Sequence, residues 1–174
     1  MELGKIPPHD IEAEQAVLGS MLTDKDAVIS AIEKLAAEDF YREDHKAIYE
    51  AITSLYNRAE PIDIITVKSE LTANGKLESV GGLEYLGILP EKVPTTANAE
   101  QYIKIVEEKA VLRNLIKTAN EIITLGYSQE EEVDDIMEMT EKRVFDILKS
   151  RNQKGYTPIR DVLVEDLQWV NLHL

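Results

Sequence analysis

The chain has 174 residues, a hydrophobic share of 44% and a formal net charge of −14 at pH 7. Its length can bury one or two small cores. Because it contains no cysteine, disulfides, thiolate metal sites and cysteine nucleophiles are excluded, which suits a reducing cytosol. The negative charge disfavours direct binding to a DNA backbone, and it fits either plain solubility or an acidic face for a basic protein partner.

No apolar run approaches the roughly 18 residues that a bilayer-spanning helix needs. The N-terminus also lacks the apolar stretch of a signal peptide. We therefore expect a cytoplasmic protein without membrane contact.

The first part of the chain predicts short helices. Asp10 can cap the first, in which Gly19 costs about 1 kcal/mol relative to Ala, so we expect a close packing neighbour there. Asp24 can start the second helix. The third is expected from about 43 to 58, and His45, near its start, is interpreted as a helix-start or surface residue rather than a metal ligand.

Asp63 can cap a fourth, shorter helix that ends at Asn74-Gly75. Residues 63–67 hold several β-branched side chains, so a strand is the alternative, although no second strand candidate exists to pair with it. Gly81-Gly82 opens a further short helix, followed by a loop.

Residues 98–124 contain no Gly or Pro, and their apolar residues recur at helical spacing. Asn98 is the expected N-cap and Gly126 the expected C′ residue. Ser128, with Glu131 as its capping-box partner, is expected to open a second long helix. Two long helices joined by so short a turn form an antiparallel hairpin. Its apolar residues exceed what one seam needs, so the rest pack on the N-terminal domain or on another chain.

Residues 150–156 are interpreted as a flexible linker. Beyond them, an amphipathic helix is expected to dock on another subunit, the alternative being a frayed end. The predicted fold is therefore all-α, with a compact helical head, a long antiparallel helical hairpin and a tethered C-terminal amphipathic linker helix. The corresponding ranges are 1–96 for the head, 97–149 for the hairpin, 150–156 for the linker and 157–174 for the terminal helix.

No catalytic motif is present. His9, His45 and His173 fit no metal-ligand pattern, and neither Gly-Lys pair has the surroundings of a phosphate-binding loop. Five carboxylates between residues 130 and 135 lack the spacing of a calcium loop, so a solvated helix start is the simpler interpretation. We expect no metal, no cofactor and no ATPase activity from these residues, and a small helical enzyme is the least favoured hypothesis.

Several short motifs in colinear order resemble the N-terminal domain of bacterial replicative DNA helicases of the DnaB family. The matching segments span roughly residues 6 to 148 and are Ile6-Pro7-Pro8, Ile11 to Ser20, Glu38-Asp39-Phe40-Tyr41 with His45, Pro61-Ile62-Asp63 with Thr66-Val67, Gly81-Gly82 with Tyr85-Leu86, Val93-Pro94-Thr95 with Ala97-Asn98, and Ile105 to Lys109 with Leu112-Arg113.

The resemblance implies a non-catalytic collar of a hexameric helicase, a trimer of dimers that assembles subunits and recruits a DnaG-type primase. A helicase loader is a further implied partner, and ATP and Mg belong to an ATPase domain that does not follow in this sequence. A free-standing helical adaptor or regulator of the helicase is the alternative.

The resemblance also implies two sets of contact residues. Four positions align with primase contacts in the family: Glu12, Tyr85, Ile116 and Ile122. The expected subunit interface comprises hairpin and linker-helix positions, namely Ile105, Leu112, Ile136, Val144, Ile159, Val162, Leu163 and Leu167.

Overall fold

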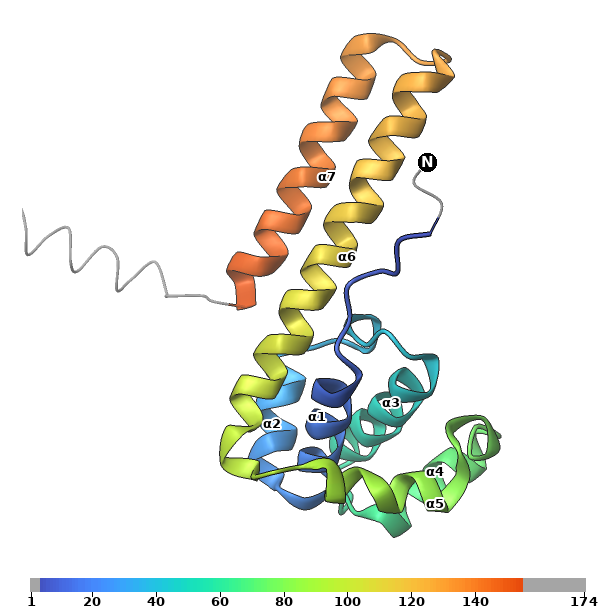
Figure 1. The fold of residues 1–174 in the computed structure, drawn as a ribbon, viewed down its shortest axis with the longest axis vertical. Helices are drawn as coiled ribbons and strands as arrows, with labels where there is room; N and C mark the ends of the chain where they lie inside the picture. Colours follow the sequence, from blue (N-terminus) through green and yellow to red (C-terminus); the bar gives the residue numbers. More distant parts are fainter. Residues whose placement is uncertain (1–3, 155–174) are drawn as a thin grey trace, which may run out of the picture. The chain divides into compact units, whose positions relative to one another are not determined.

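The computed structural model describes residues 4–154, with side chains described as far as residue 150. The described residues form helices and turns and contain no strand, in agreement with the predicted all-α fold. They divide into two compact units between Ala119 and Asn120, inside the longest helix (Figure 1). We call these the N-terminal unit and the C-terminal unit.

The helices follow one another with short connections. Their bounds are α1 Ile11–Thr23, α2 Lys25–Lys34, α3 Glu43–Asn57, α4 Ile64–Ala73, α5 Gly82–Ile88, α6 Ala99–Ser128 and α7 Val133–Lys154, and the 3₁₀ turns are η1 Ala37–Asp39, η2 Glu78–Val80, η3 Leu89–Lys92 and η4 Thr96–Asn98.

Three aspartates begin helices as the sequence predicts. Asp10 accepts a hydrogen bond from the Ala13 amide at 2.9 Å, and Asp24 accepts one from the amide two residues ahead, also at 2.9 Å. Asp63 accepts from two amides and forms a capping box with Thr66. Residues 64–67 are therefore helical, and the strand alternative is wrong because this local cap provides partners for the first amides of α4.

The core of the N-terminal unit surrounds α1, which lies between α2 and α3 (Figure 1). Gly19 of α1 has the close neighbour that its sequence position predicted. A Cβ added there would lie 2.2 Å from the carbonyl oxygen of Leu89 and 2.6 Å from the Val93 side chain. A glycine is needed because the backbone of η3 takes the space of a side chain.

The first half of α6 covers this core with Ile103, Val106 and Ala110, which are buried. The helix begins at Ala99, after η4, in which Thr95 rather than Asn98 accepts the capping hydrogen bond, from the Ala97 amide. Asn98, the expected N-cap, is the last residue of η4 and directly precedes the first residue of α6.

The predicted end of the long helix is wrong. Gly126 lies inside α6 and is absent from the residues with positive φ, whereas Gln129, after the last helical residue, has φ 52°. The Ser128 hydroxyl donates to the Leu125 carbonyl at 2.9 Å, so it closes α6 rather than capping a new helix. The next helix, α7, begins only at Val133.

In the C-terminal unit, the end of α6 and α7 run antiparallel through a turn at residues 129–132, as predicted. An ion pair between Glu121 and Arg143 joins the two helices. Because α7 continues to Lys154, residues 150–154 are helical, and this part of the expected flexible linker is wrong. The predicted terminal helix, with Ile159, Val162, Leu163 and Leu167, lies outside the described residues.

Candidate interaction surface

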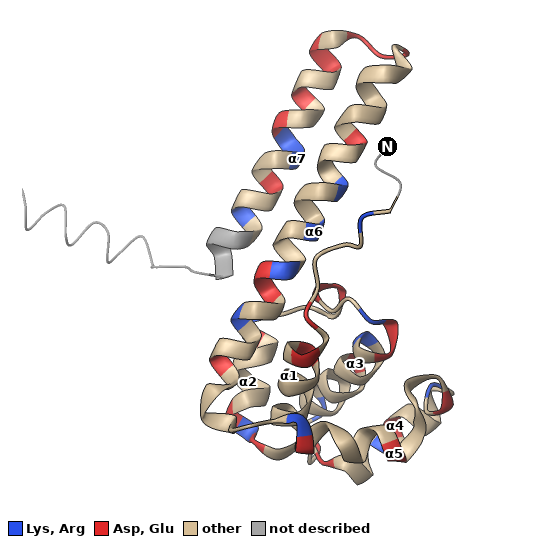
Figure 2. Cartoon of the chain, viewed as in Figure 1, with Lys and Arg blue, Asp and Glu red and all other residues tan. Residues whose placement is uncertain are grey.

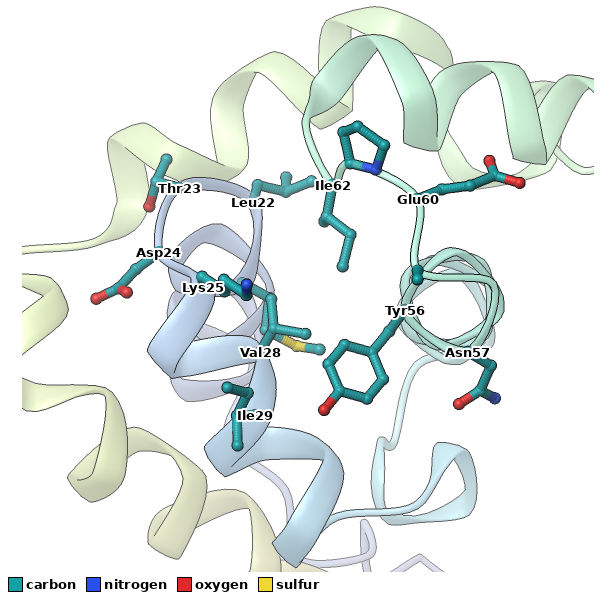
Figure 3. A pocket seen from close by; sticks show the side chains of 13 residues that line it. Leu22, Thr23, Asp24, Lys25, Val28, Ile29, Tyr56, Asn57, Glu60 and Ile62 are labelled. Atoms are coloured by element: carbon teal, nitrogen blue, oxygen red, sulfur yellow. The ribbon is translucent and has the colours of Figure 1, made fainter.

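The groove in Figure 3 has a volume of about 1000 Å³ and is lined by side chains of α1, α2, α3 and the segment 59–62. Apolar side chains predominate among them. The carboxylates of Asp24 and Glu60 point to opposite sides in that view rather than toward each other. Within residues 4–150 no three His, Asp or Glu side chains are grouped to hold a metal ion, and no described helix is long and apolar enough to cross a membrane.

The strongest surface feature is a row of exposed apolar side chains on α6. In the N-terminal unit Leu112, Leu115 and Ile116 are 44–48% exposed, although the first half of the same helix is well packed. Leu112 and Ile116 are four residues apart, which places them on one helix face. In the C-terminal unit, Ile123 and Tyr127 are also exposed and are four residues apart.

A second group of exposed apolar side chains lies on α7. It consists of Val133, Met137, Val144, Phe145 and Leu148. Val133, Met137, Val144 and Leu148 are spaced four, seven and four residues apart and share a face. Rows of this kind on a water-exposed helix are typical of protein-protein interfaces.

The predicted interface residues are distributed between surface and packed positions. Leu112 and Val144 are exposed, whereas Ile105 is half-buried against the core and Ile136 is half-buried in the C-terminal unit. Of the predicted primase contacts on the hairpin, Ile116 is 48% exposed in the N-terminal unit. Ile122 is half-buried and belongs to the C-terminal unit.

The other two predicted primase contacts lie together in the N-terminal unit. Glu12 is exposed in the first turn of α1, and Tyr85 is half-buried on α5. Gln15, one turn after Glu12, donates a hydrogen bond from Nε2 to the Tyr85 hydroxyl at 3.0 Å. The structure therefore brings the surroundings of Glu12 and Tyr85 to one region, although 73 positions separate them in the sequence.

A buried polar network holds the Tyr85 hydroxyl. Its oxygen lies 2.7 Å from His45 Nε2, and His45 Nδ1 lies 2.5 Å from a carboxylate oxygen of Glu14. Since a carboxylate accepts, Nδ1 carries the proton that it donates to Glu14, and Nε2 lies within hydrogen-bond distance of the Tyr85 hydroxyl. His45 is the third residue of α3, as expected from its position at the helix start, but it is fully buried, so the surface alternative is wrong.

Arg42 lies over the edge of this network. Its guanidinium is 5.6 Å from the centroid of the Tyr85 ring and donates to Asp44, which raises the pKa of Arg42. Burial works to raise the pKa of Asp44, but the hydrogen bond from Arg42 and the nearby His45 outweigh it, so the pKa of that carboxyl is lowered. An Arg over an aromatic ring adds a cation–π contact that holds the Tyr85 side chain.

Gly81 also shapes the position of Tyr85. Its φ is 94°, in the left-handed region, and a Cβ added there would lie 2.8 Å from the Tyr85 Cβ. Both the backbone angle and the neighbour therefore require glycine at this residue.

Arg113 anchors α6 to the N-terminal unit. Its guanidinium donates to the carbonyl of Pro8 at 2.7 Å and to the carbonyl of Asp39 at 2.5 Å. It also lies 5.7 Å from the ring centroid of Tyr41, on which His9 stacks at 4.1 Å. Burial lowers the pKa of Arg113, and the negative charge of Glu14 opposes that shift.

Glu14, His45 and Arg113 belong to the family motifs, but their buried contacts were not predicted from the sequence. A signal was available for two of them. Glu14 precedes the apolar run Ala16-Val17-Leu18, and Arg113 follows Leu112 in an apolar face. A charged residue inside such a pattern indicates either a surface break or a buried pair. Only the fold decides between a surface break and a buried pair, because the partners of Glu14 and Arg113 lie far away in the sequence.

Acidic side chains occur on both units, including the starts of α1 and α7 (Figure 2). The carboxylates at residues 130–135 stay mostly exposed at the beginning of α7, as the solvated-face interpretation expects. A surface of this sign favours a basic partner.

The fold defines a class, that of all-helical domains with a long helical hairpin. A family model described as "DnaB-like helicase N terminal domain" matches residues 6–108, and the chain belongs to this family. The DNA helicase resemblance proposed from the sequence is thereby confirmed.

Individual relatives agree with this assignment. The chain is 46% identical over 161 residues to the replicative DNA helicase DnaC of Bacillus subtilis (strain 168), covering 92% of this chain and 36% of that protein. It thus spans about a third of the length of this relative.

Two solved structures share the fold. The crystal structure of the N-terminal domain of DnaB helicase from Mycobacterium tuberculosis matches with a TM-score of 0.77 and 42% identity, covering 81% of this chain and 99% of that one. The structure described as that of "a DnaB-like replicative helicase and its interactions with primase" matches with a TM-score of 0.68 over 93% of this chain and 35% of that one. At 24% identity, this second match supports the fold alone.

Proposed function

We propose that this chain forms the N-terminal collar of a hexameric replicative DNA helicase, where it holds subunits together and recruits primase. The observation that carries the proposal is the exposed apolar surface of α6 and α7. The N-terminal unit buries the first half of α6 but leaves Leu112 and Ile116 in water, and the C-terminal unit leaves Val144 and Phe145 in water. Each unit therefore presents an apolar surface to another protein chain.

The contact residues divide between two roles. Leu112, Ile136 and Val144, with Ile105, are assigned to contacts between copies of the chain. Glu12, Tyr85, Ile116 and Ile122 are assigned to primase. The net charge of −14 favours a partner with a basic surface.

No catalytic role is proposed for these residues. Among those that the structure describes, no three His, Asp or Glu side chains are grouped to hold a metal ion, and the pair of Glu14 and His45 is buried. ATP hydrolysis and DNA unwinding are assigned to the helicase that contains such a domain.

The absolute mass in solution tests the proposal. We would measure it by light scattering after size exclusion, for the chain alone and mixed with the C-terminal domain of the primase from the same organism. We expect a mass above that of the monomer at high concentration and a joint peak with the primase domain. Separate elution of the two proteins with unchanged masses would contradict primase recruitment, and a monomer at every concentration would contradict the assembly role.

A further inference from the structure

Among the described residues of the N-terminal unit, Glu14 is the one carboxylate that is buried. Glu14 is 1% exposed, although removal of a carboxylate from water is costly unless it is paired and hydrogen-bonded. It is one of three buried polar residues in the described chain, with Ser20 and His45. Ser20 only bonds to its own helix, at the Ala16 carbonyl. Glu14 instead contacts a different element.

One side of Glu14 leads to Tyr85. Its Oε2 is 2.5 Å from His45 Nδ1, and the other imidazole nitrogen is 2.7 Å from the Tyr85 hydroxyl. The imidazole is fully buried and its ring lies nearly parallel to that of Tyr85, at 12°. The orientation of His45 is therefore set by the carboxylate, and the position of the Tyr85 hydroxyl is set by His45.

The other side of Glu14 leads to α6. Oε1 accepts a hydrogen bond from the Tyr41 amide at 2.6 Å, which fixes the backbone after η1. The ring of Tyr41 and the carbonyl of Asp39 from this same short segment receive the guanidinium of Arg113. Arg113 precedes Ile116 by three residues, so it lies next to Ile116 on α6.

We propose that Glu14 is a positioning residue that holds Tyr85 on α5 and Ile116 on α6 in one fixed arrangement, so that a single protein partner can contact both. This inference rests on the proposed function, since it takes the partner to be the primase. The buried carboxylate itself never touches the partner. It acts through His45 on one side and through Tyr41 and Arg113 on the other. Because the side chains of Tyr85 and Ile116 are already held in place, binding costs less conformational entropy.

Double-mutant cycles for binding test this role. Calorimetry would give the affinity of the full chain for the primase C-terminal domain. The proteins compared are the wild type, the single variants E14Q, Y85A and I116A, and the double variants E14Q/Y85A and E14Q/I116A. We expect E14Q to weaken binding about tenfold, and each double variant to bind within about threefold of Y85A or I116A alone. Additive losses in either cycle would overturn the proposal.

Tyr49→Phe is the matched control. It removes another buried hydroxyl of the same unit, which donates to the Leu35 carbonyl at 2.7 Å rather than to a residue of the network. We expect Y49F to lower the thermal midpoint while its affinity stays within about twofold of wild type. If Y49F and E14Q weaken binding alike, Glu14 has only a structural role and the proposal is wrong.

Two further outcomes remain distinguishable. If circular dichroism shows that E14Q does not fold, H45Q replaces it in the cycle with Y85A, because it breaks the same connection between Glu14 and Tyr85. If the wild type itself fails to bind the primase domain, the proposed function is wrong and this inference falls with it. A wild type that binds, with additive cycles, overturns the inference alone.

Discussion

At the scale of single residues, several charged side chains are held by partners from other elements. Arg58, just after α3, donates from Nη2 to Glu70 of α4 at 2.6 Å, and the Ser54 hydroxyl donates to the same carboxylate at 2.9 Å. These hydrogen bonds lower the pKa of Glu70 to about 2 from its ordinary 4.5. The pair is exposed at its Arg58 end, so water and salt weaken it.

The pH dependence of stability follows from the direction of this shift. Because the pKa of Glu70 is lower in the folded state, its stabilising effect is fully present above about pH 4.5 and is lost as the pH falls through about 2. Urea unfolding of wild type and Arg58→Gln at pH 6 and pH 2.5 would measure it. We expect the two proteins to differ more in free energy of unfolding at pH 6. Lys76→Gln, which breaks the exposed pair with Glu50, is the control.

At the scale of elements, α1 is the helix around which the N-terminal unit packs. Its middle residue Gly19 touches the backbone of η3, and its flanks contact α2 and α3. The close approach of two backbones leaves no volume for even a methyl group.

Gly19→Ala is therefore expected to destabilise the chain by about 2 kcal/mol, because overpacking outweighs the better helix propensity of Ala. Gly87→Ala is the matched control. Gly87 also lies in a helix, α5, but a Cβ there would meet nothing within 4 Å. This substitution is expected to be neutral or stabilising by up to about 1 kcal/mol. Thermal and urea unfolding would measure both, and an unchanged stability of G19A would contradict the close contact.

The attachment of α6 to the N-terminal unit gives a second prediction at this scale. Arg113→Ala removes two hydrogen bonds from a half-buried cation to the carbonyls of Pro8 and Asp39. We expect a loss of about 2–3 kcal/mol of unfolding free energy. Arg143→Ala, which breaks only the ion pair with Glu121 on a partly exposed surface, should cost less than about 1 kcal/mol. Equal losses in denaturant unfolding would argue against the anchoring role of Arg113.

At the scale of the whole molecule, buried residues stabilise the fold, whereas exposed apolar residues are available to bind a partner. Ile116 is 48% exposed, so its side chain adds little to the fold of the N-terminal unit. Glu130 is exposed in the turn before α7 and has ordinary solvated surroundings.

Ile116→Asp is accordingly expected to keep the thermal midpoint within a few degrees and to weaken primase binding at least about tenfold. Glu130→Ala should leave both unchanged. Calorimetry with the primase domain, and circular dichroism on the same samples, would measure the two quantities. Equal loss of binding in both variants would show that Ile116 has no special place in the interface.

Local signals account for what could be predicted. Asp10, Asp24 and Asp63 cap helices through amides two or three residues ahead, so their roles are visible in a short window of sequence. The helical spacing of apolar residues predicted the long α6 and α7 in the same way. The sequence also predicted that Gly19 has a close neighbour, but it did not predict that this neighbour is Leu89.

The amino-acid sequence by itself determined the all-α class, the helix starts at aspartates and the absence of catalytic motifs, because these depend on neighbours along the chain. The tertiary structure decided the rest. Glu14 and His45, which contact each other, are 31 positions apart, and the two carbonyl partners of Arg113 lie 74 and 105 positions away from it. Whether Gly126 ends a helix or continues it likewise depends on the hydrogen bonds of the turn that follows. Burial and long-range pairing are set by packing between elements, and no short segment contains that information.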